Sequence, residues 1–235
     1  MNLILLFPED FLGEAHVRLA GRRLQHVSDI HRAAVGDHLA VGLLNGAMGR
    51  GQVTRLDAEG LELKVELNQP APPKLPLTLL LALPRPKVLN RALASAASLG
   101  VARIILLNAW KVEKAYWKSP KLAPENLREQ LILGLEQAKD TVLPELIMAR
   151  LFRPFVEEEL PLLAKGQQLL VGHPGAPTAC PRALEGPAVL AIGPEGGWVE
   201  TELASLQNAG FQAVDLGPRI LRVETALAAL VGRLY

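Results

Sequence analysis

The chain has 235 residues, of which 49% are hydrophobic, 21% charged and only 4% aromatic. Its 25 Lys and Arg against 24 Asp and Glu give a formal charge of +1, which excludes a uniformly basic nucleic-acid binder but allows a local basic patch. A single cysteine, the absence of a basic leader and the lack of an apolar run near the roughly 20 residues of a membrane span predict a cytoplasmic protein without membrane contact.

The first part of the chain is predicted to consist mainly of strands, at residues 3–7, 37–44, 51–56 and 61–67, with one short helix around 21–30. Asn45-Gly46 separates two of these strands and favours a tight hairpin, because both residues tolerate positive φ. Four prolines then fall within residues 68–76 and predict an extended linker. We therefore expect a small β-barrel over residues 1–68 and a second domain over residues 76–235.

The second domain alternates predicted strands and helices. The strands are expected at 78–83, 101–107, 167–172, 187–193 and 212–217, and the helices at 88–99, 125–139, 200–209 and 223–234. Continuously apolar strands separated by helices are typical of a mostly parallel sheet that is covered on both faces. The fold class is therefore predicted to be α/β.

Three of these strands end in loops rich in glycine and proline, at residues 172–175, 193–197 and 217–219. Ligands of such sheets lie beyond the carboxyl ends of the strands, and glycine lets a ligand approach bare backbone. One such loop alone is more simply a strand-to-helix turn, but three together favour a binding site.

The type of ligand is limited by the motifs that the sequence lacks. Neither a dinucleotide-binding nor a P-loop fingerprint is present, and no serine stands in a nucleophile elbow. The five histidines are dispersed, so no metal site is expected. What remains is a ligand held by backbone groups and apolar walls. Arg222 is either a surface residue or part of a cleft, and Glu224 either a first-turn acid of the last helix or part of the site.

The motifs IGPEGGW (192–198) and LGPRILRVETA (216–226), preceded by HPG (173–175), together resemble the RsmE family of SPOUT-class RNA methyltransferases. The resemblance implies an N-terminal PUA-like barrel that helps to bind RNA and a C-terminal domain with a deep trefoil knot. It also implies S-adenosylmethionine as cofactor, a homodimer, and methylation at N3 of one uridine near the 3′ end of 16S rRNA in the small ribosomal subunit.

The resemblance carries over to particular residues of this chain. The implied cofactor-binding residues are Val171, Gly172, His173, Pro174, Ile192, Gly193, Pro194, Glu195, Gly196, Gly197, Leu216, Gly217, Arg219, Ile220 and Leu221. The implied catalytic residues are Arg222, which would stabilise charge on the uracil oxygens, and Glu224, which would orient Arg222 or relay the proton.

RNA contacts are expected from basic residues in both domains: Arg22, Arg23, His26 and Arg32 in the first and Lys111 in the second. Either group is equally compatible with a solvated surface. Trp110, Tyr116 and Trp117 lie among the lysines of the second group and could stack an extruded base.

The chain departs from the family pattern at Ser95, Ser98 and Asp140, which leaves the substrate open. The alternatives are the same chemistry on tRNA or 23S rRNA, or a non-catalytic RNA-binding dimer.

Overall fold

The computed structural model describes residues 2–235, and its contacts divide the chain into two compact units. The first unit holds the residues up to 73 together with 132–143, and the second holds 74–131 and 144–235. No helix of the described chain is long and apolar enough to cross a bilayer.

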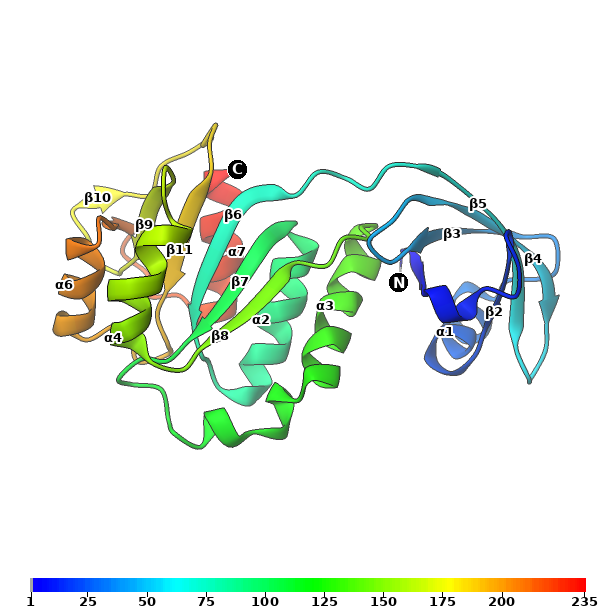
Figure 1. Ribbon diagram of the computed structural model, residues 1–235, viewed down its shortest axis with the longest axis horizontal. Coiled ribbons are helices and arrows are strands. Elements are labelled where there is room, and N and C mark those ends of the chain that lie inside the picture. The colour runs from blue at the N-terminus through cyan, green and yellow to red at the C-terminus, as the bar shows by residue number, and fades with distance from the viewer. Residues whose placement is uncertain (1) are drawn as a thin grey trace. The chain divides into compact units, whose positions relative to one another are not determined.

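The first unit is built on a curled five-stranded sheet with the order β1-β3-β4-β5-β2 (Figure 1). Its strands are β1 (Ile4–Leu6), β2 (His16–Leu19), β3 (His38–Leu43), β4 (Met48–Leu56) and β5 (Leu61–Gln69). A helical segment, α1 (Gly21–His26), continues as a wider turn over Val27–His31. Among the described strands, β1 and β2 stand at opposite edges and no strand pairing joins them, so the barrel expected over residues 1–68 stays a prediction.

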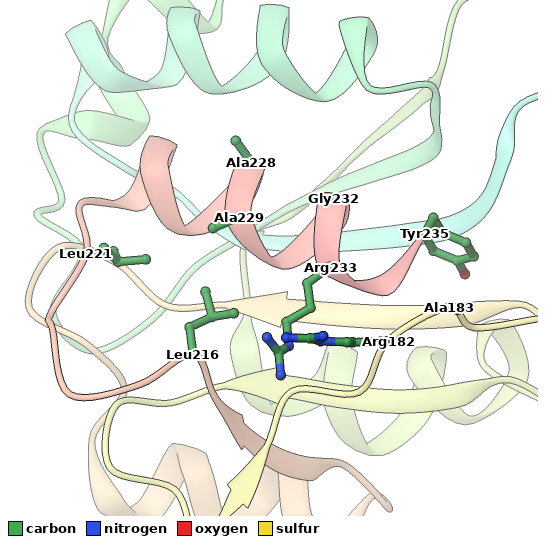
Figure 2. A pocket seen from close by; sticks show the side chains of 9 residues that line it. All are labelled: Arg182, Ala183, Leu216, Leu221, Ala228, Ala229, Gly232, Arg233 and Tyr235. Atoms are coloured by element: carbon green, nitrogen blue, oxygen red, sulfur yellow. The ribbon is translucent and has the colours of Figure 1, made fainter.

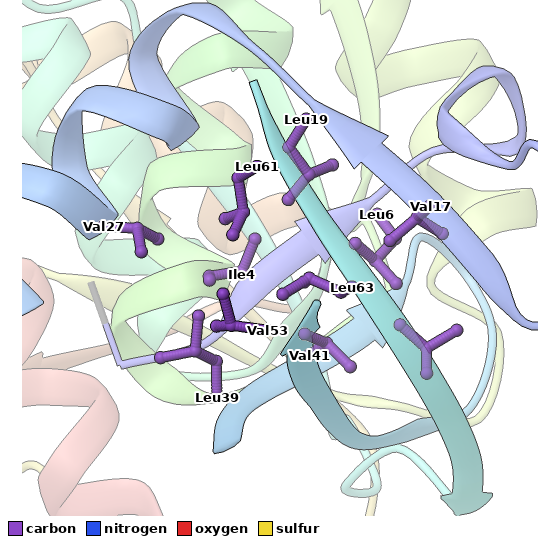
Figure 3. Packing of buried hydrophobic residues seen from close by; sticks show 11 residues of the cluster. Ile4, Leu6, Val17, Leu19, Val27, Leu39, Val41, Val53, Leu61 and Leu63 are labelled. Atoms are coloured by element: carbon purple, nitrogen blue, oxygen red, sulfur yellow. The ribbon is translucent and has the colours of Figure 1, made fainter. Parts of the chain in front are cut away.

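Alternation of side chains gives this sheet one buried face. In β5, Leu61, Leu63 and Val65 point inward while the residues between them are half-buried or exposed. Figure 3 shows Leu61 and Leu63 packed against residues from β1, β3 and β4, such as Ile4 and Val41, and Val65 belongs to the same cluster. The expected hairpin joins β3 to β4, where Asn45 has a φ of 59°. Period-2 hydrophobicity therefore sets which face of the sheet forms the core.

The later segment 132–143 belongs to this first unit. The N–H of Leu3 donates to the carbonyl of Glu136 at 3.0 Å, and the N–H of Asn45 donates to the carbonyl of Thr141 at 2.8 Å. Thr141 also donates its hydroxyl to the Gly46 carbonyl at 2.6 Å. These bonds satisfy backbone groups of the sheet edge and of the hairpin turn, which the first 73 residues leave unpaired.

The second unit contains a seven-stranded sheet with the order β10-β12-β9-β11-β6-β7-β8, and all its neighbouring strands are parallel. The strands are β6 (Leu75–Ala82), β7 (Val101–Leu107), β8 (Glu145–Ala149), β9 (Gln168–Gly172), β10 (Thr178–Ala179), β11 (Ala188–Ile192) and β12 (Gln212–Asp215). Every residue of the central β11 is buried, as expected for a strand covered on both faces. The predicted parallel α/β sheet is thus confirmed.

Helices connect these strands and cover the sheet (Figure 1). They are α2 (Pro86–Ser98), α3 (Pro124–Ala138), α4 (Phe152–Pro154), α5 (Leu160–Leu163), α6 (Glu200–Asn208) and α7 (Val223–Leu234). Shorter helical turns lie at Pro8–Asp10, Tyr116–Lys118, Pro120–Leu122 and Phe155–Glu159. Helices α2 and α7 pack against each other, and both contact the sheet, so they cover the same face. Helix α3 begins in the second unit, and its last turns belong to the first.

Candidate functional site

The three glycine-rich loops meet at one edge of the parallel sheet. Gly172 at the end of β9 is in register with Ile192 of β11 on one side and with Val214 of β12 on the other. The N–H of His173 donates to the Val214 carbonyl at 3.0 Å, which joins the first loop to the third strand. The strand ends that carry the three loops are therefore neighbours, and the assignment of residues 171–174, 192–197 and 216–221 to one binding site stays a prediction.

The second loop has a shape that depends on its glycines. Gly197 has a φ of +70°, and the loop is closed by a bond from its N–H to the Pro194 carbonyl at 2.8 Å. A Cβ on Gly193 would lie only 3.2 Å from both the backbone nitrogen and Nε1 of Trp198. Side chains at these positions would strain the turn or displace the indole.

Trp198 packs beneath this loop and has an unsatisfied polar atom. The indole is 6% exposed and lies against Phe152, with ring centroids 6.0 Å apart. Its Nε1 is buried and finds no hydrogen-bond acceptor among the described residues. A buried donor without a partner is costly, so this N–H indicates a place where a polar ligand group fits.

The other two loops differ in exposure. In the first, Val171 is buried, Gly172 and His173 are half-buried, and Pro174 is exposed. A Cβ on Gly172 would lie 2.9 Å from Cδ1 of Leu230 on α7, so this glycine permits close packing of that helix. The third loop turns at Gly217, with a φ of +121°, and exposes Arg219 and Ile220.

Two carboxylates of the candidate site are paired with arginines that the sequence analysis did not identify. Glu195 accepts bonds at 3.1 Å from both the backbone N–H and Nε of Arg85, which directly precedes α2. Glu224 accepts a bond at 3.0 Å from Nη2 of Arg91, on the same helix. The expectation that Glu224 orients Arg222 therefore needs correction, because its partner is Arg91. Arg222 itself is exposed and forms no side-chain hydrogen bond or ion pair within residues 2–235.

An open pocket of about 660 Å³ lies between the third loop and α7 (Figure 2). Leu216 and Leu221 line it, together with Arg182, Ala183, Ala228, Ala229, Gly232, Arg233 and Tyr235. Of the predicted cofactor residues only Leu216 and Leu221 reach this pocket, because the first two loops lie further along the sheet edge. The pocket thus adjoins the candidate site from the side of α7.

The segment that follows β10 crosses the end of α7 beside this pocket. The N–H of Leu184 donates to the Leu234 carbonyl at 2.6 Å, and Nε of Arg233 donates to the Cys180 carbonyl at 2.7 Å. The hydroxyl of Tyr235 donates to the Gly186 carbonyl at 3.0 Å. These bonds fix the last turn of the chain under residues 180–186.

The predicted RNA-binding residues differ in their exposure and in the ion pairs and hydrogen bonds that they form within the protein. Arg23 is 14% exposed and holds the carboxylate of Asp10 with two nitrogens, so its charge is used inside the first unit. Arg22 pairs with the buried Glu136 at 2.8 Å, His26 is half-buried, and Arg32 is exposed. In the second unit, Nζ of Lys111 donates to the Gly196 carbonyl at 2.7 Å. Arg23 is therefore structural, and Lys111 steadies the second loop.

No group of three or more His, Cys, Asp or Glu side chains in the described chain is arranged to hold a metal ion.

Comparison with known proteins connects this geometry to a family. The RNA methyltransferase domain family matches residues 71–235. The ribosomal RNA small subunit methyltransferase E of Treponema pallidum is 32% identical over 97% of this chain and 88% of its own length. The protein of the same name from Mycobacterium tuberculosis is 28% identical over 88% of this chain and 81% of its own length.

Solved structures show the same fold. A candidate methyltransferase from Legionella pneumophila, in complex with the bound cofactor SAM, has a TM-score of 0.75 at 25% identity and covers 98% of this chain and 96% of its own. The ribosomal RNA small subunit methyltransferase E of Neisseria gonorrhoeae has a TM-score of 0.72 at 24% identity, with coverages of 98% and 95%.

Proposed function

This chain belongs to the RNA methyltransferase family that includes the ribosomal RNA small subunit methyltransferases E, and we propose that it methylates N3 of one uridine near the 3′ end of 16S rRNA. It is an S-adenosylmethionine-dependent rRNA methyltransferase. The observation that supports the site most directly is the meeting of three glycine-rich loops at one sheet edge. Because the substrate is ribosomal RNA, we place the activity in the cytoplasm.

The residues at the sheet edge fit the cofactor. When bound, it supplies an electrophilic methyl group on a sulfonium. The turns at Gly197 and Gly217 leave backbone open on their ligand side, since a Cβ on either would meet nothing within 4 Å. The unpaired Nε1 of Trp198 lies against Gly193 and offers a donor to a polar group. We assign cofactor binding to residues 171–174, 192–197 and 216–221.

Arg222 and Glu224 are proposed to act on the uracil. N3 must lose its proton as it gains the methyl group, so negative charge develops on the neighbouring carbonyl oxygens. The exposed, unpaired guanidinium of Arg222 suits the stabilisation of that charge. Glu224 suits a proton relay, and its bond to Arg91 orients the carboxylate.

Two finer features of the fold belong to the same proposal. We propose that the curled sheet of the first unit acts as a PUA-like barrel, closed with help from residues 132–143. We also propose that the chain end forms a trefoil knot. The passage of α7 under residues 180–186, held by Leu184, Arg233 and Tyr235, supports this threading.

We further propose that the enzyme is a homodimer joined through α7. The outer side of this helix exposes only small residues, Thr225, Ala228, Ala229 and Gly232, which permit close approach of a second helix. Ile220, just before the helix, is 85% exposed. Light scattering should give a dimer for the wild type and a monomer for Ala228→Glu. A monomeric wild type would refute this assembly.

RNA binding is proposed to use Arg32 and His26 in the first unit, with Arg22 contributing the exposed part of its guanidinium. Arg23 is omitted because its two nitrogens are bound to Asp10. These contacts would be to phosphates and would carry no sequence information by themselves.

Methyl transfer to three separate substrates tests the function. Labelled S-adenosylmethionine would be incubated with small subunits, naked 16S rRNA and total tRNA, and the product nucleoside identified by mass spectrometry. We expect 3-methyluridine in 16S rRNA. Label in tRNA or 23S rRNA alone would show that the substrate is another RNA. A protein that binds cofactor but labels nothing would be a non-catalytic RNA-binding dimer.

A further inference from the structure

An exposed indole stands just beyond β7, with its backbone held by a buried carboxylate. Trp110 is 83% exposed, and its backbone N–H donates to Oε1 of Glu202 at 2.7 Å. Glu202 is only 7% exposed, and its Oε2 accepts the N–H of Val199 at 3.2 Å. Burying a carboxylate costs free energy unless hydrogen bonds compensate for the lost water, and Glu202 forms two such bonds to backbone N–H groups. Here it fixes the position from which an aromatic ring projects into solvent.

This position is linked to the proposed cofactor loop in two ways. Glu202 lies in the first turn of α6, the helix into which residues 193–198 lead. The neighbouring Lys111 donates to the Gly196 carbonyl at 2.7 Å. Trp110 and the second loop therefore share one rigid framework, although they are 83 or more residues apart in the sequence. A ring placed there lies at the same sheet edge as the three loops.

The other two aromatic residues of this region, Tyr116 and Trp117, already form contacts within the protein. Nε1 of Trp117 donates to Oδ1 of Asn108 at 2.8 Å, and the guanidinium of Arg150 lies 5.2 Å from the centre of its ring. The hydroxyl of Tyr116 donates to Glu113 at 3.0 Å. Of the three aromatics that the sequence offered for stacking, Trp110 is the one whose ring faces solvent.

Two cations follow the carboxyl ends of the paired strands β7 and β8, the same end of the sheet from which Trp110 projects. Lys111 is its neighbour in sequence, and Arg150 follows β8, whose end is tied to β7 by the bond from the Asn108 N–H to the Ala149 carbonyl at 3.0 Å. Both side chains are exposed. Proteins hold single-stranded nucleic acid with exposed aromatic rings and cations in one region, because bases stack on the rings and phosphates meet the charges.

We propose that Trp110 is a stacking platform for one unpaired base of the RNA substrate, and that Glu202 is the positioning residue that holds it beside the cofactor loop. The inference rests on the proposed function, since the RNA concerned is the one to be methylated. Lys111 and Arg150 supply the adjoining phosphate contacts.

Quenching of tryptophan fluorescence by acrylamide tests the contact without any methylation. Trp198 is buried and Trp117 half-buried, so the quenchable signal of the full-length protein comes mainly from Trp110. A single-stranded uridine-rich RNA oligonucleotide should protect this signal. An abasic oligonucleotide with the same number of phosphates should not. Equal protection by both would refute stacking and leave only phosphate binding.

Substitutions test the size of the effect. Trp110→Ala should weaken binding of the uridine-rich oligonucleotide roughly 5- to 150-fold, and Trp110→Phe should restore most of the affinity. Leu162→Ala is the matched control, because Leu162 is also exposed, at 81%, and lies outside the site. Wild-type affinity of Trp110→Ala for this oligonucleotide would overturn the proposal. The proposal would also be overturned if Trp110→Ala kept its affinity for the oligonucleotide and lost only its binding to assembled small subunits. That result would mean that a ribosomal protein, and not a base, contacts the indole.

The role of Glu202 is tested by a double-mutant cycle. Glu202→Gln replaces one acceptor oxygen by an N–H donor, so it cannot accept both backbone bonds. At saturating cofactor it should raise KM for RNA several-fold while kcat changes little, and it should have no further effect on KM in a Trp110→Ala background. An equal increase in both backgrounds would show a merely structural role.

The two proposals fail differently. If the wild type labels no RNA but still shows base-dependent protection of Trp110, the methyltransferase function fails and the platform stands. If 16S rRNA is methylated equally well by wild type and Trp110→Ala, with equal fluorescence protection, the platform fails and the function stands.

Discussion

Replacement of Gly193 by alanine tests whether the second loop binds the cofactor. The added Cβ would lie 3.2 Å from the backbone nitrogen and from Nε1 of Trp198, and 3.3 Å from its Cδ1. Neither neighbour can yield easily, since one is backbone and the other belongs to an indole that is 6% exposed. Overpacking of this kind costs about 1–3 kcal/mol. For a chain of this size, that lowers Tm by about 2–12 °C.

The same displacement should weaken cofactor binding. Trp198 and Gly193 are proposed to form one wall of the site, so a shift of a few tenths of an ångström moves the wall itself. We expect S-adenosylhomocysteine to bind about tenfold more weakly, which corresponds to about 1.4 kcal/mol. At a ligand concentration of 100 times the wild-type Kd, ligand stabilises the wild type by about 2.7 kcal/mol. The variant should retain about half of that.

Thermal unfolding with and without S-adenosylhomocysteine, together with calorimetric titration, measures both effects. Gly186→Ala is the matched control, because a Cβ there meets nothing within 4 Å and the residue has no positive φ. This control should keep the wild-type Kd and Tm. A Gly193→Ala protein with wild-type Kd and an undiminished ligand-induced shift would show that the cofactor does not contact this loop.

Three further predictions follow from contacts described above. Arg23→Met leaves the buried Asp10 carboxylate with the Phe7 backbone N–H but without its cationic partner, and should cost about 3–5 kcal/mol in urea unfolding. Arg32→Met should leave stability unchanged and reduce the salt dependence of RNA binding by about one phosphate contact. If Arg23→Met is fully stable, the structural role is wrong. Arg91→Met removes the partner of Glu224, so kcat should fall about tenfold with an unchanged Kd for S-adenosylhomocysteine; an unchanged kcat would mean that Glu224 needs no orientation. Burial raises the pKa of the Cys180 thiol, so less of it is thiolate at pH 8, and iodoacetamide should label it at least about tenfold more slowly in the native protein than in urea. Equal rates would contradict this burial.

The elements predicted best are those with strong periodicity. The strand at 101–107 and the last helix at 223–234 have the bounds that were expected, because an unbroken apolar run and a regular apolar face leave little choice. The short strands β2, β8 and β10 were missed. All three lie at sheet edges and are partly exposed, so they lack the continuous apolar run that marks the equally short β11, and pairing with a neighbouring strand stabilises them.

For the candidate site, the sequence predicted the loops, whose backbone shape requires particular residue types, but it did not predict the side-chain pairs. Glycine and proline mark the three loops, since strained turns and close approaches restrict the residue type. The pairs that hold the site leave no such mark: Arg91 and Glu224 are 133 residues apart, and Trp110 and Glu202 are 92 apart. An arginine within or directly before a helix, such as Arg91 or Arg85, has no pattern that distinguishes a site residue from a surface residue. The order of the strands brings these pairs together, and local sequence does not encode that order.

The division of the first unit between two stretches of chain also has a consequence for biosynthesis. The residues up to 73 lack the backbone partners that 132–143 provide, and those partners are made 70 residues later (143 minus 73). At 5–20 residues per second, that is a delay of roughly 4–14 s. During this time the nascent sheet keeps an open edge, and β6 and β7 are synthesised before it can be completed. The order in which the parts mature is therefore not the order in which they are translated.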